Sequence, residues 1–153
     1  MKLFTWSDEL ATGLDAVDSQ HHELVKRINS FLKLSASGDC GRDDLVKTFR
    51  FLRTYALEHF AWEKSLMQQT DYPTMVSHLN DHARLRAWVE RMAGQLATIE
   101  LGTNVILDIN YHLIDWLQQH FKTVDRRMTD HVREYAKRHE MSIKRLLKQI
   151  FQS

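Results

Sequence analysis

Pairs of metal-binding side chains recur four residues apart in this chain. His78 and His82 occur in HLNDH, and His59 and Glu63 occur in HFAWE. Because residues four apart differ by about 40° around an α-helix, each pair projects from one helix face on successive turns. Such pairs bind metal ions when neighbouring helices direct them into the core of a bundle.

Hydrophobic spacing indicates which of the other histidines point inward. His21 shares a helix face with the hydrophobic residues around it, whereas His22 is rotated by about 100° onto a more polar flank. His120 lies on the hydrophobic face of a later segment, one turn after Trp116 and Leu117. Each of four segments therefore directs at least one imidazole into the core.

Five inward-facing imidazoles need partners in a hydrophobic interior. A single inward histidine is more often an ordinary core residue with a hydrogen bond. Burying five of them without any partner would cost on the order of several kcal/mol in lost hydration. Imidazole together with carboxylate suits iron, zinc or copper better than magnesium or calcium. The pattern therefore predicts a transition-metal site.

Four segments with hydrophobic residues at helical spacing predict four helices. They cover about residues 18–34, 43–69, 74–99 and 104 onward. Gly38 and Gly41 break the chain after the first segment, and Pro73 closes the second because proline disfavours helix just before itself. Amphipathic helices joined by short loops predict an all-α protein, folded as an up-down-up-down four-helix bundle.

A further amphipathic pattern fills residues 141–151 and predicts an extra C-terminal helix. From residue 126 onward the chain has eight basic and three acidic side chains. We expect a bundle domain over residues 1–128 and a basic helical extension over residues 129–153. The favoured interpretation is a fifth helix packed on the bundle. A protein contact, or weak association with an anionic membrane surface, is the alternative for residues 141–151.

Composition narrows the class of protein. The formal net charge is +1, which gives no global attraction to nucleic acid. Cys40 is the only cysteine, so no intrachain disulfide is possible, and we interpret it as an incidental exposed thiol. No hydrophobic run suits a signal peptide or a membrane span. These features favour a cytoplasmic protein of one bundle domain.

The metal-binding residues follow one ordered pattern, H…HxxxE…HxxxH…HxxxxD. It is met by His21, His59, Glu63, His78, His82, His120 and Asp125. The flanking residues and motifs support the same pattern: Trp6, D-x-Q-H ending at His21, Tyr72–Pro73, and W-L-x-x-H ending at His120. Over about residues 6–128 the sequence resembles the hemerythrins, specifically their bacterial single-domain type.

The resemblance implies two non-haem iron ions, bridged by two carboxylates and an oxo or hydroxo group. His78, His82 and His120 would hold one iron, and His21 and His59 the other. Glu63 and Asp125 would bridge them. Counting bonds gives six ligands at the first iron and five at the second. The open position implies reversible O2 binding for storage, delivery or sensing, with no catalytic residue.

Two expectations from the resemblance concern the placement of Asp125 and the surroundings of bound O2. Asp125 follows His120 by five residues, or about 140° on an ideal helix, so it reaches the site only through a bend or a π-type turn. Asp115 is a rival on spacing alone. A hydrophobic wall should protect bound O2, and Leu117, Trp116 and Phe60 are its candidates.

Other functions remain open at this point. A di-iron oxidase, peroxidase or nitric-oxide-handling protein would use a similar bundle, although such sites usually carry more carboxylates. A signalling protein, in which oxygenation moves the C-terminal extension, would act through a partner. Storage of iron or zinc is less favoured, because the residues specify a fixed site.

Overall fold

The helices end where the sequence changes its backbone preference. A computed structural model describes residues 3–38, 41–95 and 103–151 of the chain. Its elements, in chain order, are η1 (Asp8–Leu10), α1 (Asp15–Ala36), α2 (Arg42–Gln69), α3 (Met75–Gln95), α4 (Thr103–Gln119), η2 (His120–Asp125), α5 (Arg126–Arg138) and α6 (Ile143–Phe151). The predicted all-α class is confirmed. Cys40 and the predicted end of the third helix near residue 99 lie outside the described residues.

Two left-handed residues end the helices that frame the site. Asp71 has φ +52° after α2, and Glu140 has φ +51° after α5. The next N–H groups turn back, from Tyr72 to the Met67 carbonyl at 3.0 Å and from Met141 to the Ala136 carbonyl at 2.9 Å. These six-to-one hydrogen bonds satisfy carbonyls that the helix end leaves free.

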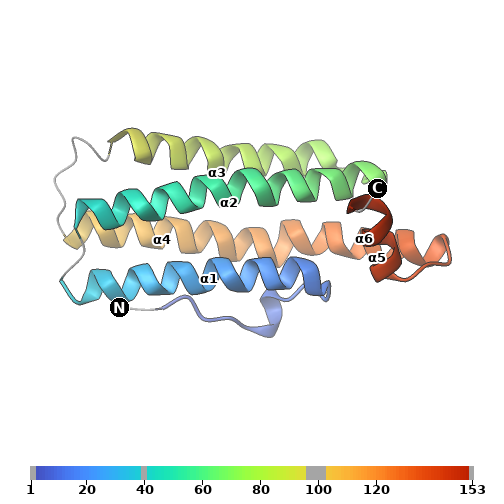
Figure 1. The fold of residues 1–153 in the computed structure, drawn as a ribbon, viewed down its shortest axis with the longest axis horizontal. Helices are drawn as coiled ribbons and strands as arrows, with labels where there is room; N and C mark the ends of the chain where they lie inside the picture. The colour runs from blue at the N-terminus through green and yellow to red at the C-terminus, as the bar shows by residue number, and fades with distance from the viewer. Residues whose placement is uncertain (1–2, 39–40, 96–102, 152–153) are drawn as a thin grey trace.

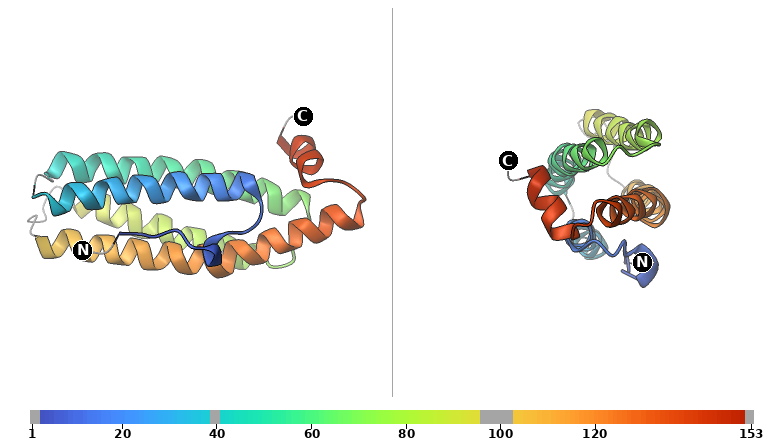
Figure 2. Two further views of the ribbon diagram at one scale, coloured as in Figure 1. Left: turned by 90° about the horizontal axis from the view of Figure 1, so that it is seen from below. Right: turned by 90° about the vertical axis from the view of Figure 1, so that its right-hand side faces the viewer.

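The helices α1, α2, α3 and α4 lie side by side along the long axis, as predicted for a four-helix bundle (Figure 1). Helix α4 continues through η2 into α5 as one long helical segment, which extends beyond the other helices at one end (Figure 1). The end-on view in Figure 2 shows the four helices around a common centre. None of the described helices is both long and apolar enough to cross a membrane.

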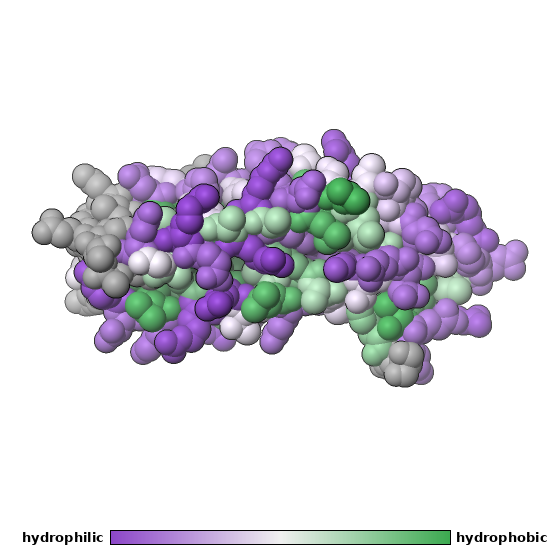
Figure 3. Space-filling view, turned by 90° about the horizontal axis from the view of Figure 1, so that it is seen from above, coloured by the Kyte–Doolittle hydropathy of each residue, from purple (hydrophilic) through white to green (hydrophobic). Residues whose placement is uncertain are grey.

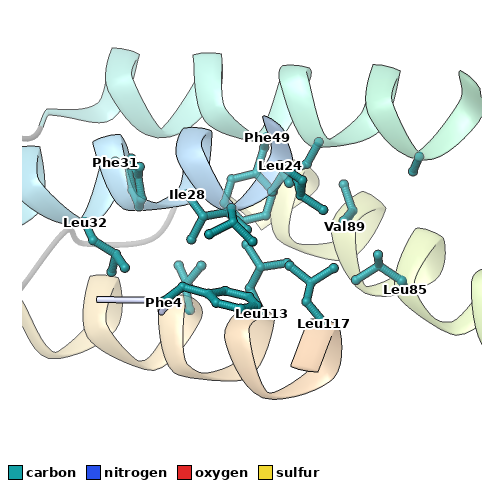
Figure 4. Close-up of a cluster of buried hydrophobic side chains, with 14 of the residues drawn as sticks. Phe4, Leu24, Ile28, Phe31, Leu32, Phe49, Leu85, Val89, Leu113 and Leu117 are labelled. Carbon is teal, nitrogen blue, oxygen red and sulfur yellow. The ribbon is translucent and has the colours of Figure 1, made fainter. Parts of the chain in front are cut away.

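The hydrophobic interior is divided into two clusters. The larger one includes Leu24, Ile28, Phe49, Leu113 and Leu117, whose side chains converge from α1, α2 and α4 (Figure 4). The smaller cluster comprises Leu14, Val17, Leu66, Met67, Met128, Val132, Ala136 and Leu146. On α1, on α2 and along the segment from α4 to α5, the inward histidines lie between residues of the two clusters. On α3, the partly buried Met75 packs against the smaller cluster and Leu85 lies in the larger one, so hydrophobic residues flank the polar centre on both sides along the bundle.

The C-terminal amphipathic helix packs on the bundle, in agreement with the favoured prediction. Leu146 of α6 is buried in the smaller cluster, and Phe151 stacks on Trp62 of α2 at 4.8 Å. Figure 2 shows α6 folded across one end of the bundle. The face formed by α2 and α3 is mainly hydrophilic, with hydrophobic residues in separate spots (Figure 3).

Candidate metal centre

The structure brings all seven residues of the predicted pattern to one place. His21 comes from α1, His59 and Glu63 from α2, His78 and His82 from α3, and His120 and Asp125 from η2. Their exposed fractions are 0–5%, which is unusual for ionisable side chains. The centre is therefore shielded from bulk solvent by the bundle.

A π-helical turn places Asp125 beside His120. Residues His120–Asp125 form η2, the π-helix between α4 and α5. Because π-type hydrogen bonds join residues five apart, this turn stacks His120 and Asp125 on one face. His120 Nε2 and Asp125 Oδ1 are 2.8 Å apart. The rival Asp115 is exposed on α4, so the structure favours Asp125.

Glu63 directs its two oxygens to different histidines. Its Oε1 lies 2.7 Å from His59 Nε2. Its Oε2 lies 3.0 Å from both His78 Nε2 and His82 Nε2. One carboxylate therefore spans the histidines of α2 and α3.

Asp125 divides its oxygens in the same manner. Its Oδ2 lies 2.9 Å from His21 Nε2. Its Oδ1 lies 3.2 Å from His78 Nε2 and 2.8 Å from His120 Nε2. Asp125 thus spans His21 of α1 and the histidines of α3 and η2.

The donor atoms form two groups that share both carboxylates. One group contains Glu63, His78, His82, His120 and Asp125, and the other contains His21, His59, Glu63 and Asp125. Within each group the donor atoms lie within 4.8 Å of one another. The geometry alone thus separates three imidazoles from two and joins the groups through the same two residues.

Several of these buried atoms have short neighbours but no hydrogen-bond partner among the described residues. They are His21 Nε2, His59 Nε2, Glu63 Oε1, His120 Nε2, and Asp125 Oδ1 and Oδ2. Buried polar atoms without partners are rare and costly, and an ion that satisfies them is a recognised explanation. The donor set fits that explanation.

The spacing also fits a first-row transition ion. Such ions hold imidazole nitrogens at about 2.1 Å, so adjacent donors of an octahedron lie about 3 Å apart. The nitrogen-to-oxygen distances around Glu63 and Asp125 are 2.7–3.2 Å. Nitrogen and carboxylate donors together are typical of iron or zinc sites.

The charges in the centre shift its protonation. Burial favours neutral forms, but the carboxylates outweigh it and raise the pKa of His78 to about 9 and that of His120 to about 10. Burial raises the pKa of Glu63 and of Asp125, and repulsion by Asp125 adds to this at Glu63, but the histidines outweigh these effects and hold the pKa of both carboxylates well below the usual range. His82 differs, because burial lowers its pKa.

Two histidines are held from outside the centre. Gln20 Oε1 accepts a hydrogen bond from His59 Nδ1. Asp81 Oδ2 lies 2.5 Å from His120 Nδ1. Outer contacts of this kind fix the ring orientation of a metal-binding histidine and leave Nε2 free to bind.

The hydrophobic residues predicted to line the O2 pocket lie against different parts of the centre. Phe60 stacks on His82 at 3.7 Å, and Trp116 stacks on His120 at 4.5 Å. Leu117 is buried in the larger cluster. The first two therefore contact the group with three imidazoles, and their pocket role stays a prediction.

The sequence interpretation missed Phe121 and Tyr55. Phe121 stacks on His21 at 3.7 Å, and Tyr55 stacks on His59 at 5.0 Å. Both contact the group with two imidazoles. The position of Tyr55 four residues before His59 was a usable signal, whereas Phe121 lies on the π-turn, where ideal helical spacing misleads.

The other histidines lie away from the centre. His22 and His112 are exposed and stack on Trp6 and Trp88, at 3.8 Å and 4.6 Å. His131 Nε2 contacts the Thr70 carbonyl at 2.6 Å. Tyr111 is 53% exposed, so it is not a hydrogen-bond donor to the centre.

A bundle with a shared histidine and carboxylate centre defines a class of metal-binding helical proteins. Comparison with known sequences agrees with that class. The family profile described as "Hemerythrin HHE cation binding domain" matches residues 12–140. The chain belongs to the hemerythrin family.

Individual relatives are distant but cover most of the chain. A bacteriohemerythrin from Stenotrophomonas maltophilia is 26% identical over 157 residues, which cover 99% of each chain. Another from Pseudomonas paraeruginosa is 28% identical and covers 93% of this chain and 86% of its own length. Myohemerythrin-1 from Phascolopsis gouldii is 26% identical and covers 80% of this chain and 88% of its own.

A solved structure supports the fold. The crystal structure of a hemerythrin mutant has a TM-score of 0.75 and 24% identity, and the match covers 86% of this chain and 98% of that one. At this identity the likeness concerns the bundle, and the chemistry rests on the residues of the centre.

Proposed function

We propose that this protein binds two non-haem iron ions at the centre and binds O2 reversibly there. The single observation that carries the proposal is the sharing of Glu63 and Asp125 between the two donor groups. Each carboxylate points one oxygen toward each group, as bridging of two ions requires. His78, His82 and His120 would hold one ion, and His21 and His59 the other.

The unequal number of imidazoles provides a place for a small molecule. The group with His21 and His59 offers one nitrogen fewer than the other group, so an ion held there would keep a position available for a small molecule. A pair of ferrous ions held there would supply the electrons for reversible binding of O2. The residues of the chain would hold both ions in place throughout.

The surroundings favour reversible binding over reaction. Both shared carboxylates have a lowered pKa in the metal-free protein, and cations in the centre would favour the ionised form further, so at neutral pH neither carboxylate has a proton to donate. Phe121 covers one face of the His21 ring at 3.7 Å and is itself buried. A dry, proton-poor pocket protects bound O2 from release in reduced form.

The ligand composition distinguishes this proposal from a di-iron oxidase. Oxidase sites in related bundles rely mainly on carboxylates, including Glu-x-x-His pairs. The two groups here contain five histidines and two carboxylates. A histidine-rich set with few carboxylates supports a carrier of O2, used in storage, delivery or sensing.

Oxygen uptake tests the proposal. Anaerobic protein loaded with Fe²⁺ is mixed with a known amount of O2 in an oxygen electrode, and argon is then passed through the solution. We expect uptake of one O2 for every two irons, and the same uptake again when O2 is readmitted after argon has removed the first portion. Catalase added before the argon step should return nothing. Return of O2 on adding catalase would instead show that peroxide had been released, as from an oxidase.

A further inference from the structure

The two outer contacts of the centre occupy equivalent places in the two halves of the bundle. Gln20 directly precedes His21 and bonds His59, whereas Asp81 directly precedes His82 and bonds His120. Both contacts join residues that are 39 positions apart. In each half, the residue that precedes one inward histidine therefore accepts a hydrogen bond from an inward histidine of the following helix.

The two halves of the bundle also have equivalent aromatic residues, which stack on these histidines. Tyr55 lies four residues before His59 and stacks on it with an interplanar angle of 20°. Trp116 lies four residues before His120 and stacks on it with an angle of 13°. Each imidazole is thus fixed by one acceptor and one aromatic face.

The charge of the acceptor differs between the halves. Gln20 offers a neutral amide oxygen, whereas Asp81 offers a carboxylate at 2.5 Å. The Asp81 side chain is only 22% exposed, so water screens this charge incompletely. Arg84 is 3.9 Å from the other carboxylate oxygen, but its side chain is 78% exposed. Hydrogen bonds to a charged acceptor are roughly twice as strong as neutral ones.

We propose that Gln20 and Asp81 are positioning residues that make the two metal positions electronically unequal. Asp81 places its negatively charged carboxylate next to the outer nitrogen, Nδ1, of His120. Gln20 gives His59 Nδ1 a neutral acceptor instead. The inference rests on the proposed function, because it requires metal ions in the centre. It adds to that function a reason why the two ions would differ in affinity and in reduction potential.

The physical effect follows from electron donation. An imidazole that donates its outer N–H to a carboxylate is a more basic ligand than one that donates to an amide. A more basic ligand favours the more highly charged metal ion. Asp81 should therefore strengthen metal binding at the group with three imidazoles and lower the reduction potential there. Gln20 should leave the ion at His21 and His59 easier to reduce.

Isosteric exchanges separate charge from position. The variants are Asp81→Asn, Gln20→Glu, the double exchange, and Asp81→Ala. Asn keeps an acceptor of the same size and removes the charge, whereas Ala removes both. Zn²⁺ is the probe, since it binds nitrogen and carboxylate donors without redox chemistry. Its affinity is measured by competition with a chelator, and circular dichroism checks the fold of each variant.

Proton NMR of the Zn²⁺-loaded protein shows which position has changed. In the wild type, we expect the His120 Nδ1–H signal further downfield than that of His59, because its acceptor is charged. The double exchange should reverse this order. Asp81→Asn should weaken Zn²⁺ binding about 10- to 100-fold, the range found when outer contacts of metal ligands are changed. Gln20→Glu should strengthen binding at the other position.

The reduction potential of the iron-loaded protein supplies an independent readout. Asp81→Asn should raise it, and Gln20→Glu should lower it. The proposal is overturned if Asp81→Asn matches the wild type in affinity, signal order and potential while only Asp81→Ala is impaired. Should Asp81→Asn fail to fold, an unchanged potential in Gln20→Glu overturns it. Failure of the wild type to bind Zn²⁺ or iron would instead contradict the proposed function.

Discussion

The α1–α2 half of the centre and the α3–η2 half are built alike but equipped differently. Both fix a histidine through an acceptor 39 residues earlier in the chain. The first half contributes two imidazoles and a neutral acceptor, and the second contributes three imidazoles and a carboxylate. Glu63 and Asp125 join the halves by sending one oxygen to each.

This difference shows how a nearly symmetric bundle can produce an asymmetric site. The helices supply similar backbone positions in both halves. The side-chain types at those positions decide which group has the larger number of metal ligands. One missing imidazole leaves a place for a small molecule, and one additional charge stabilises the opposite position. The following variants test whether the halves are unequal for these reasons.

Removal of the joining carboxylate should have the largest effect. We expect Asp125→Asn to bind fewer than two metal ions per chain, because Asp125 contributes to both groups and its replacement takes away the carboxylate that contacts the buried His21. Metal analysis after dialysis measures the loss. Asp115→Asn is the matched control, since Asp115 is exposed on α4, and it should keep the full metal content.

Loss of one imidazole should affect the halves unequally. His59→Ala leaves a single imidazole in the first half, so we expect that metal position to be lost. His82→Ala leaves two imidazoles in the second half and should retain both ions with weaker affinity. Metal content and a Zn²⁺ titration compare the two variants. Equal loss in both would contradict the division into unequal groups.

Proton release should come mainly from the second half. Because His78 has a pKa of about 9 and His120 of about 10, both are in the doubly protonated, charged form at pH 8 in the metal-free protein. Metal binding requires their neutral forms, so loading at pH 8 should release at least these two protons, and affinity should rise with pH. An indicator dye in weak buffer measures the release; its absence would contradict this protonation.

The same raised pKa values affect the stability of the metal-free fold. Their contribution is fully present below the ordinary histidine pKa of 6.5 and is lost as pH rises through about 9 and about 10. Thermal unfolding without metal should therefore occur at a lower temperature at pH 10 than at pH 6.5. A melting temperature that rises over this range would oppose the assignment.

The smallest effect should come from Tyr55→Phe in the first half. The Tyr55 hydroxyl donates to the Gln20 carbonyl at 3.2 Å, and its ring stacks on His59. Phe keeps the stacking and removes the hydrogen bond, so we expect a loss of about 0.5–1.5 kcal/mol in unfolding free energy. Metal content should not change. Loss of an ion would show that the hydroxyl holds Gln20 against His59.

The sequence was sufficient for most of the fold because hydrophobic periodicity and helix-ending residues act locally. The helical segments, the inward direction of His21 and the packed C-terminal helix could all be predicted. Asp125 could be placed only through family resemblance, since regular helical geometry points it elsewhere. The π-turn that resolves this depends on tertiary packing, which no local pattern encodes.

The outer contacts could not be predicted for a related reason. Gln20 and Asp81 contact histidines on neighbouring helices, and the contact depends on how the helices are rotated against each other. Phe121 was missed because the π-turn changes the direction of side chains after His120. Inward-facing residues could be predicted helix by helix, whereas contacts between helices required the assembled bundle.

Reversible O2 binding is tested most directly by the visible absorption spectrum of the iron-loaded, reduced protein through one cycle of O2 and argon. We expect a colourless solution that gains a charge-transfer band with O2 and loses it when O2 is removed. The cycle should repeat on the same sample. A spectrum that changes once with O2 and stays in the oxidised form under argon would contradict reversible binding.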